Sequence, residues 1–328
     1  MNKTYGKYVV NKTGAPEVLE WTQEEFRQSA SNEVRVRNEA VGVDFIDTMI
    51  RSGQLPTALP VGIGFAGVGI VEDFGTEVRN LSKGDRVAYM YFVGGSYAEQ
   101  RYVPADRVFK LPDQSLSPVI AAGALFRGLT AWYLATRLRD LKQGDTALVH
   151  AAAGGVGLIL VQWLTHLGVK VVGTVHEKTK VSTLLTYGCH YPVVIPEEDF
   201  AAKVKEVSDG KGAAVVYESI GAATFGKSLD CAGRFGLIVS YGWPSGDPGE
   251  VSLMTLRNKG SLFITRPTVT HYTAEPADFR CGATELFRMI KEGNLRIHVE
   301  HKYPLRQAAK AHEDIVAGKT VGSVVLVV

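Results

Sequence analysis

The sequence predicts an α/β protein in which a β-rich domain is interrupted by a doubly wound parallel sheet. Three observations lead to this prediction. Residues 1–120 hold β-branched runs without a regular alternation of helices. From Lys142 to Pro267, strand and helix candidates alternate, as in a parallel sheet covered by helices on both faces. The last run, Ser323–Val328, is nearly all valine and suits a buried strand, so we expect the C-terminal segment to return to the first domain.

Strands are expected in the first domain where β-branched residues cluster between turn residues. Lys83-Gly84-Asp85 and Gly94-Gly95 are turns of this kind. A loop-like passage from Pro104 to Pro118 leads into a helix expected at 118–138. The expected strands are Tyr8–Val10, Glu33–Val43, Gly67–Phe74 and Asp85–Tyr91.

The alternation after Lys142 has the spacing of successive βαβ units. We expect domains at residues 1–125, 126–267 and 268–328, with the middle range inserted between two parts of one domain. After Pro267 we expect a helix at 276–292, a strand at 296–300 and a helix at 305–317. Within the inserted domain, the expected strands are 146–150, 170–175, 191–195, 213–218, 235–241 and 261–265, and the expected helices are 155–168, 177–187, 199–208 and 222–232.

The segment Thr146–Gly157 combines a buried strand, a glycine turn and the start of a helix. Ala152 replaces the first glycine of a dinucleotide-binding turn, Gly154 lets the backbone approach a pyrophosphate, and Gly157 lets the helix pack closely on the strand. The N-terminus of the helix would face the phosphates with its N–H groups. Because the turn lies within a βαβ unit, we predict a nucleotide site rather than a turn used only for packing.

Composition and charge exclude several classes of function. The chain has 328 residues, 45% hydrophobic and 21% charged, and a formal net charge of +2. A net charge this close to zero does not favour binding to nucleic acid or to an anionic membrane. The N-terminus lacks the apolar core of a signal peptide, and Cys189, Cys231 and Cys281 are too widely spaced for a disulfide framework or a zinc cluster. We expect a cytoplasmic protein without a metal; no cysteine or histidine precedes His150.

The second strand of the inserted domain indicates which nicotinamide cofactor binds. NAD-specific turns carry an acidic residue at the end of this strand. Here the strand ends Gly173-Thr174-Val175, which leaves room and carries no charge, and Lys180 follows where it could meet a 2′-phosphate. Glu177 lies close by and would repel that phosphate unless it points into solvent. These residues favour NADPH and leave NADH as the alternative.

Several segments together resemble one known family. The chain resembles the quinone oxidoreductase (zeta-crystallin-like) branch of the zinc-free medium-chain dehydrogenase/reductases, nearly from end to end. This resemblance implies a GroES-like catalytic domain with an inserted Rossmann domain, a homodimer formed through the Rossmann sheet edge, and NADPH-dependent reduction of quinones or enones. The segments are Val41–Thr48, Arg51–Gly53, His150–Gly157, Tyr217–Gly221, Gly260–Leu262 with Thr265–Pro267, and Lys302–Leu305.

The resemblance also implies which positions meet the cofactor and the substrate. The segment Phe45–Met49 lies under the nicotinamide, and Asp44 and Met49 belong to the substrate side. The segment from His176 to Lys180 surrounds the 2′-phosphate. The implied cofactor residues are Phe45, Asp47, Met49, Tyr133, Gly154, Gly155, Val156, Gly157, His176, Lys180, Ile220, Gly242, Ser245, Pro267, Thr268 and Val269.

Some positions depart from the family pattern. Met49 and Leu55 replace two tyrosines, which removes two hydroxyl groups and favours a more hydrophobic acceptor. Asp44 replaces an asparagine; it either hydrogen-bonds the nicotinamide ribose or substrate, or is a carboxylate held by backbone N–H groups or exposed. The other departures are Gly64-Phe65-Ala66 for glycine–threonine–glutamate, Ile195 for tyrosine and Gly318 for arginine.

The leading expectation is hydride transfer from NADPH to a quinone, with the protein supplying position and electrostatics. Reduction of an α,β-unsaturated carbonyl is an alternative, and it requires a proton delivered to carbon. A nucleotide-binding protein with little catalysis, in a crystallin-like structural role or a moonlighting role, is a third interpretation, because both family tyrosines are absent. Turnover of NADPH with a panel of acceptors separates these interpretations.

Overall fold

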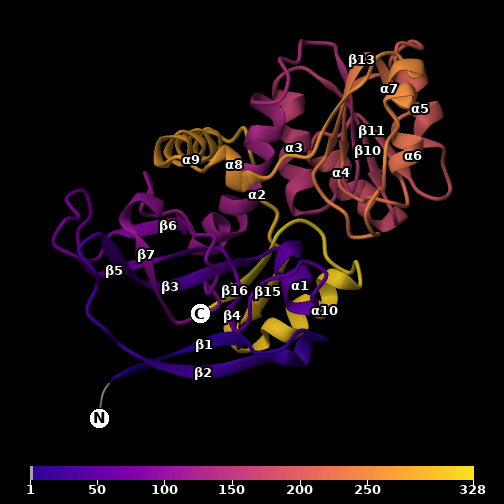
Figure 1. The fold of residues 1–328 in the computed structure, drawn as a ribbon. Coiled ribbons are helices and arrows are strands. Elements are labelled where there is room, and N and C mark those ends of the chain that lie inside the picture. Colours follow the sequence, from indigo (N-terminus) through magenta and orange to yellow (C-terminus); the bar gives the residue numbers. More distant parts are fainter. Residues whose placement is uncertain (1–2) are drawn as a thin grey trace. The chain divides into compact units, whose positions relative to one another are not determined.

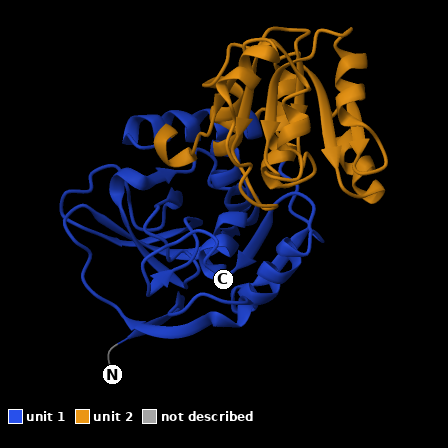
Figure 2. Cartoon of the chain, turned by 45° about the vertical axis from the view of Figure 1, so that its right-hand side comes forward, with its two compact units in different colours: residues 1–129, 273–291, 297–328 blue, residues 130–272, 292–296 orange. Residues whose placement is uncertain are grey.

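The computed structural model describes residues 3–328 and divides into two compact units (Figure 1, Figure 2). Unit 1 comprises the described residues up to Leu129, together with Thr273–Lys291 and Ile297–Val328. Unit 2 comprises Thr130–Tyr272 and Glu292–Arg296. Unit 1 is therefore built from both ends of the chain, with unit 2 inserted between them.

Unit 1 is β-rich, and its strands form two sheets. They are β1 (Thr4–Val10), β2 (Leu19–Glu25), β3 (Glu33–Val43), β4 (Val61–Gly62), β5 (Ala66–Phe74), β6 (Arg86–Met90), β7 (Gln100–Pro104), β8 (Val108–Lys110), β15 (His301–Pro304) and β16 (Val324–Val327). One sheet has the order β15-β16-β3-β5-β6-β8, with β7 also paired to β3, and the other has the order β2-β1-β4. In the larger sheet β16 is antiparallel to β3, with Val324 opposite Val43. The predicted return of the C-terminal segment to the first domain is confirmed.

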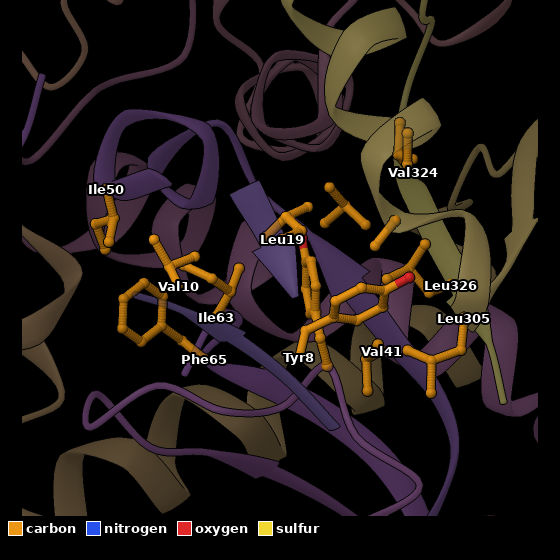
Figure 3. Packing of buried hydrophobic residues seen from close by; sticks show 14 of the residues in the cluster. Tyr8, Val10, Leu19, Val41, Ile50, Ile63, Phe65, Leu305, Val324 and Leu326 are labelled. Carbon is orange, nitrogen blue, oxygen red and sulfur yellow. The ribbon is translucent and has the colours of Figure 1, made fainter. Parts of the chain in front are cut away.

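The core of unit 1 joins segments that are far apart in the sequence (Figure 3). Tyr8 of β1, Val41 of β3 and Leu326 of β16 pack in one cluster with Ile50. Ile50 comes from α1 (Phe45–Ser52), so this cluster holds α1 against the sheets. The other helices of unit 1 are the first part of α2 (Pro118–Thr136), α9 (Pro276–Lys291) and α10 (Ala308–Val316).

Helix α1 is missing from the sequence prediction, although its ends carry local signals. Asp44 is the N-cap, and Asp44 and Asp47 form a capping box in which each side chain accepts the other residue's backbone N–H. The helix ends at Gly53, whose φ of 86° lies in the left-handed region that favours glycine. These signals were available in the sequence, and they define the helix that carries the predicted nicotinamide-side residues.

Unit 2 is a parallel sheet with the order β11-β10-β9-β12-β13-β14. Counted from β9, this is the 3-2-1-4-5-6 order of a doubly wound dinucleotide-binding fold, and the order reverses between β9 and β12. The strands are β9 (Thr146–Val149), β10 (Lys170–Val175), β11 (Tyr191–Val194), β12 (Ala213–Glu218), β13 (Ala232–Ser240) and β14 (Phe263–Thr265), and the helices are α3 (Gly155–His166), α4 (Val181–Thr186), α5 (Phe200–Val207), α6 (Phe225–Ser228), α7 (Leu253–Asn258) and α8 (Val269–Tyr272). Ligands of such sheets bind beyond the carboxyl ends of the strands at the reversal point.

Two predicted elements are wrong. The strand predicted at 296–300 does not form, and β15 starts at His301 instead. Arg296 cannot join a strand ladder because the Gln162 side chain binds both its backbone N–H (2.8 Å) and its carbonyl (3.0 Å). The helix predicted at 222–232 is reduced to α6, since Ala222 donates its N–H to the Gly246 carbonyl and β13 begins at Ala232.

Candidate cofactor and catalytic site

The glycine turn between β9 and α3 is shaped by close backbone contacts. Its left-handed residue is Ala151, with φ of 46°, rather than the predicted turn residue Ala152. The Gly154 N–H donates to the Ala151 carbonyl at 2.9 Å and closes the turn. A Cβ at Gly157 would lie 2.4 Å from the Ala151 oxygen and 2.7 Å from Ala152 Cα. Only glycine at 157 lets α3 begin this close to the turn.

No side chain among the described residues caps the N-terminus of α3. Its N-cap is Gly154, and the Leu158 N–H donates to the Gly154 carbonyl at 3.0 Å. The preceding residues Gly155, Val156 and Gly157 therefore present the N–H groups of an uncapped first turn, where the helix dipole is positive. This geometry suits a pyrophosphate, and it lies at the carboxyl end of β9, beside the reversal point.

Two loops at the same edge of the sheet are joined by hydrogen bonds. Ser245 donates both its N–H (3.0 Å) and its hydroxyl (2.6 Å) to the Ile220 carbonyl. Gly221 has φ of 98°, and a Cβ there would lie 2.3 Å from the Gly246 oxygen. A Cβ at Gly242 would lie 2.6 Å from the Ser219 oxygen. The structure thus brings together Ile220, Gly242 and Ser245, three of the predicted cofactor residues.

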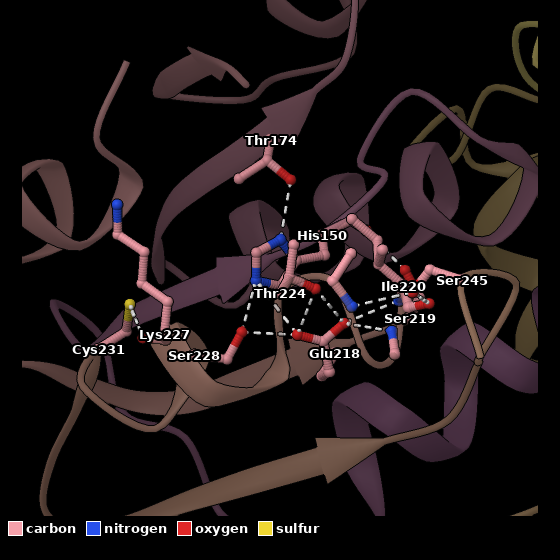
Figure 4. A network of polar contacts seen from close by, with 12 residues as sticks. His150, Thr174, Glu218, Ser219, Ile220, Thr224, Lys227, Ser228, Cys231 and Ser245 are labelled. Atoms are coloured by element: carbon pink, nitrogen blue, oxygen red, sulfur yellow. Dashed lines mark hydrogen bonds and ion pairs between the residues drawn. The ribbon is translucent and has the colours of Figure 1, made fainter. Parts of the chain in front are cut away.

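A buried polar network lies beneath these loops, and the sequence prediction did not include it (Figure 4). Glu218, at the end of β12, is fully buried and accepts the N–H groups of Ile220 (2.7 Å) and Gly221 (3.1 Å). Ser228 links Glu218 to His150, which is also fully buried. The network joins side chains from the ends of three neighbouring strands at the reversal point.

The end of β10 differs from the sequence-based interpretation. Gly173 and Thr174 are buried, so they do not leave room for a ribose. A Cβ at Gly173 would lie 2.7 Å from Cys189 Sγ, and the Thr174 hydroxyl contacts His150 Nδ1 at 3.0 Å. Both residues serve the packing and the buried network of unit 2. The absence of an acidic side chain at this strand end remains the feature that favours NADPH over NADH.

The predicted 2′-phosphate residues follow β10 on the surface of unit 2. His176 and Glu177 are exposed, and Lys180 is partly buried. Lys178 forms an ion pair with Glu197 at 2.7 Å, and this partner raises the pKa of Lys178. The ion pair occupies Lys178, and the prediction assigns Lys180, two residues further along the chain, to the phosphate.

Tyr133 lies on α2 in unit 2 and is almost completely buried. Its ring stacks on that of Tyr272, with centroids 4.4 Å apart and planes 4° apart. Tyr272 ends α8, which begins at Val269, directly after Pro267 and Thr268. The stack therefore connects Tyr133 to the predicted cofactor segment 267–269 and gives this tyrosine a packing role.

The predicted nicotinamide-side residues lie on α1 in unit 1. Asp47 and Met49 are buried, and Phe45 is partly exposed. They belong to a different unit from the phosphate-side residues. Asp44, the N-cap of α1, is buried, and its carboxylate lies 3.2 Å from the guanidinium of Arg127.

Asp47 belongs to a buried cluster of titratable groups. Its carboxylate accepts the Asp44 N–H and the Tyr97 hydroxyl, each at 2.9 Å. The Tyr97 oxygen also lies 3.1 Å from His312 Nε2. Burial, with the nearby Asp44 charge, raises the pKa of Asp47 to about 8, and burial also raises the pKa of Asp44 against the effect of Arg127. Burial lowers the pKa of His312 to about 3, so the cluster holds a neutral imidazole beside its carboxyl groups.

Three phenylalanines of unit 1 form an aromatic group that the sequence prediction missed. Phe65, Phe92 and Phe126 have ring centroids 5.8 to 6.4 Å apart. Phe92 and Phe126, together with Leu55, are partly exposed and pack on the same core cluster as Ile50 of α1. Their spacing along the chain gives no periodic signal, so only the folded structure brings them together.

Two further features of residues 3–328 concern metal binding and membrane insertion. In this part of the chain no group of three His, Cys, Asp or Glu side chains is placed to hold a metal ion. Helix α2 is long and apolar enough to cross a membrane, but 78% of its apolar window is buried inside the structure. A core helix of a folded domain has the same properties.

The fold and the uncapped glycine turn define a nucleotide-dependent dehydrogenase or reductase with an inserted cofactor unit. Residues 30–113 match the family described as alcohol dehydrogenase GroES-like domain, and residues 187–326 match the zinc-binding dehydrogenase family. The chain is 42% identical to a quinone oxidoreductase of Pseudomonas aeruginosa, over 95% of this chain and 96% of that protein. The chain belongs to the quinone oxidoreductase family of the medium-chain dehydrogenase/reductases.

Two further relatives bear on cofactor and substrate. The crystal structure of Escherichia coli quinone oxidoreductase complexed with NADPH matches with a TM-score of 0.95 at 39% identity, covering 98% of this chain and all of the other. A 2-haloacrylate reductase of Burkholderia is 40% identical over 97% of each chain. The family thus contains proteins named for two kinds of acceptor.

Proposed function

We propose that this protein is an NADPH-dependent reductase that transfers hydride to quinones without a metal. The observation that carries the proposal is the uncapped N-terminus of α3 at the reversal point of the unit 2 sheet, beside the joined loops of Ile220 and Ser245. The E. coli relative crystallised with NADPH and the relatives named quinone oxidoreductase support it.

The residues of unit 2 fit the phosphate side of this cofactor. A Cβ at Gly157 would clash with the backbone of the turn, so only glycine allows the helix to start this close to it. Gly155, Val156 and Gly157 would hold the pyrophosphate through backbone N–H groups, and Gly154, whose own N–H closes the turn, would let the backbone approach it. His176 and Lys180 would face the 2′-phosphate, and the remaining flanking residues would be Tyr133, Ile220, Gly242, Ser245, Pro267, Thr268 and Val269.

When bound, NADPH supplies the hydride, and the residues of unit 1 orient the acceptor. Asp44, Phe45, Asp47 and Met49 are the proposed residues of the nicotinamide and substrate side. Leu55, which is partly exposed, and Met49, which is buried on α1, place apolar side chains where the family has tyrosine hydroxyls, so we expect preference for an acceptor with an extended apolar ring system.

Steady-state oxidation of NADPH with a panel of quinones tests the proposal. We expect turnover with naphthoquinones that exceeds turnover with unsubstituted benzoquinone. If NADPH binds but no quinone or enone is reduced, the chain is a nucleotide-binding protein and the reductase proposal is wrong.

Reduction of an α,β-unsaturated carboxylate is a second candidate. The Burkholderia relative is named for such a substrate. This reaction needs a proton delivered to carbon, whereas the reduced oxygens of a quinone can take theirs from solvent. Faster NADPH oxidation with 2-chloroacrylate than with any quinone would favour this candidate.

One edge of the unit 2 sheet exposes apolar side chains. The edge strand β14 exposes Phe263 and Ile264, and the neighbouring helix α7 exposes Leu253 and Met254. An exposed apolar sheet edge suits pairing with a second copy, so we propose a homodimer formed through β14. Sedimentation equilibrium tests the homodimer, and we expect Phe263→Lys to be a monomer.

The free thiols of the described cysteines suit the reducing cytoplasm, where we propose that the protein is located.

A further inference from the structure

The buried network at the carboxyl edge of unit 2 is a chain of hydrogen bonds that runs across three strands (Figure 4). It begins at Thr174 of β10, passes through His150 after β9 and Ser228 of α6, and ends at Glu218 of β12. All four side chains are buried. The chain therefore crosses the reversal point of the sheet, where the cofactor is proposed to bind.

The hydrogen-bond donors around Glu218 occupy both of its carboxyl oxygens. The N–H groups of Ile220 and Gly221 both point to Oε1, and backbone N–H groups cannot reverse direction. The hydroxyl groups of Thr224 (2.9 Å) and Ser228 (2.6 Å) approach Oε2. A carboxylate accepts such a set of donors without conflict, and these bonds compensate its burial.

This arrangement fixes the tautomer of His150. Ser228 gives its only hydroxyl proton to Glu218, so its oxygen accepts from His150 Nε2 at 2.9 Å. His150 Nδ1 is then unprotonated and accepts the Thr174 hydroxyl at 3.0 Å. Burial lowers the pKa of His150 against the effect of Glu218, consistent with a neutral ring. His150 is thus the Nε2–H tautomer, and every bond in the chain points toward Glu218.

The two ends of the chain hold different parts of the proposed cofactor site. At one end, Glu218 fixes the Ile220–Gly221 segment, which binds the loop of Ser245. At the other end, the Thr174 carbonyl accepts the Ala152 N–H of the glycine turn at 2.9 Å. The His150 carbonyl also accepts the Ser219 hydroxyl at 3.1 Å.

We propose that Glu218 is a positioning residue for the dinucleotide, acting on the loop after β12 directly and on the glycine turn through Ser228 and His150. The proposal rests on the proposed function, because it assumes that NADPH binds at this edge. Glu218 does not touch the cofactor. It aligns the two backbone segments that do, so that little ordering is needed on binding.

The tautomer of His150 provides a test that does not depend on activity. In Glu218→Gln the amide oxygen must accept the two backbone N–H groups, so the amide NH₂ takes the position of Oε2 and donates to Ser228. Ser228 then donates to His150, which changes to the Nδ1–H tautomer. Imidazole ¹⁵N shifts should show Nε2–H in the wild type and Nδ1–H in Glu218→Gln. The same tautomer in both proteins would overturn the proposal.

Calorimetric titration with NADPH tests the positioning role. Glu218→Gln keeps the loop acceptor, so we expect its Kd to stay within about 3-fold of the wild type, whereas Glu218→Ala should bind about 10-fold more weakly or worse. Val204→Ala, a truncation of a buried residue on α5 of the same unit, is the control for general destabilisation and should bind NADPH normally.

The outcomes separate this inference from the proposed function. A wild type that does not bind NADPH contradicts the proposed function. A wild type that binds it, with Glu218→Ala binding equally well, contradicts only the positioning role. If Glu218→Ala does not fold, Ser228→Ala keeps the loop bonds and removes the hydroxyl that bridges Glu218 Oε2 and His150 Nε2, which lie 3.5 Å apart. A Kd unchanged from the wild type would then overturn the proposal.

Discussion

The carboxylate of Asp44 lies 3.2 Å from Nη2 of Arg127, and both side chains are almost completely buried. Arg127 Nη2 also donates to the carbonyl of Val43, one residue before Asp44. Gly42 makes room for this pair, because a Cβ there would lie 3.2 Å from Arg127 Nη1. The pair fixes the start of α1, the helix that carries the proposed nicotinamide-side residues.

Arg127→Met should be strongly destabilising, because it leaves the Asp44 charge buried without a partner. We expect a loss of about 3–5 kcal/mol in the free energy of unfolding, measured by urea denaturation at pH 7. The double variant Arg127→Met with Asp44→Asn removes that charge and should recover most of the loss. If the double variant is as unstable as the single one, the ion pair is not the reason for the effect.

The stability of the protein should fall with pH through the titration of Asp47. Its pKa is raised from an ordinary value near 4 to about 8, so the folded state holds a proton that the unfolded state releases. This contribution is complete below about pH 4 and is lost as pH rises toward 8, by at most about 1.4 kcal/mol per pH unit. The groups that face it are Asp44, Tyr97 and Arg127.

Asp47→Asn imitates the protonated carboxyl group and should remove this dependence. Between pH 5.5 and 7.5, we expect the wild type to lose on the order of 2 kcal/mol relative to the variant, from urea denaturation at each pH. Parallel pH profiles for the two proteins would show that Asp47 is ionised in the folded state and would contradict the prediction.

The sequence predicted the nucleotide-binding half of the fold well because its strands are continuous apolar runs. The predicted limits of β10 and β12 agree with the structure residue for residue. The strand at 296–300 was wrong because the contact that prevents it, Gln162 with Arg296, joins residues far apart in the chain. No local pattern contains such a contact.

The candidate site could be predicted only where one short segment forms it. The glycine turn and the start of α3 follow from local residue types. In contrast, Glu218, Ser228, His150 and Thr174 come from four elements, and their sequence separations conceal the network. The same holds for Asp44 and Arg127, whose pairing depends on how α2 lies in unit 1.

Gly157→Ala should weaken NADPH binding by about 10-fold or more. The new Cβ would lie within 2.7 Å of the turn backbone, so the turn or α3 must shift. Overpacking of this kind typically lowers the free energy of unfolding by about 1–3 kcal/mol. Gly226→Ala is the matched control, since a Cβ at this helical position meets no atom within 4 Å. Equal NADPH affinity in both variants would mean that the turn does not hold the pyrophosphate.

Leu55→Tyr should shift acceptor preference toward smaller quinones. The side chain is partly exposed, so a tyrosine fits there, and its hydroxyl supplies a donor to a quinone oxygen. One such hydrogen bond predicts a rise of about 2- to 10-fold in kcat/KM for benzoquinone. Gln54→Tyr, at the exposed neighbouring position, should leave kcat/KM unchanged. A similar rise in the control would remove position 55 from the acceptor site.

Equilibrium binding of NADPH and NADH to the wild-type protein, measured by titration calorimetry, tests the central claim most directly. The claim is that the uncapped turn of α3, the uncharged end of β10 and Lys180 form a site for the phosphorylated cofactor. We predict that NADPH binds at least about 10-fold more tightly than NADH, as one charge-assisted contact to the 2′-phosphate would produce. Equal affinities, or tighter binding of NADH, would contradict the assignment of NADPH, and binding of neither would contradict the nucleotide site itself.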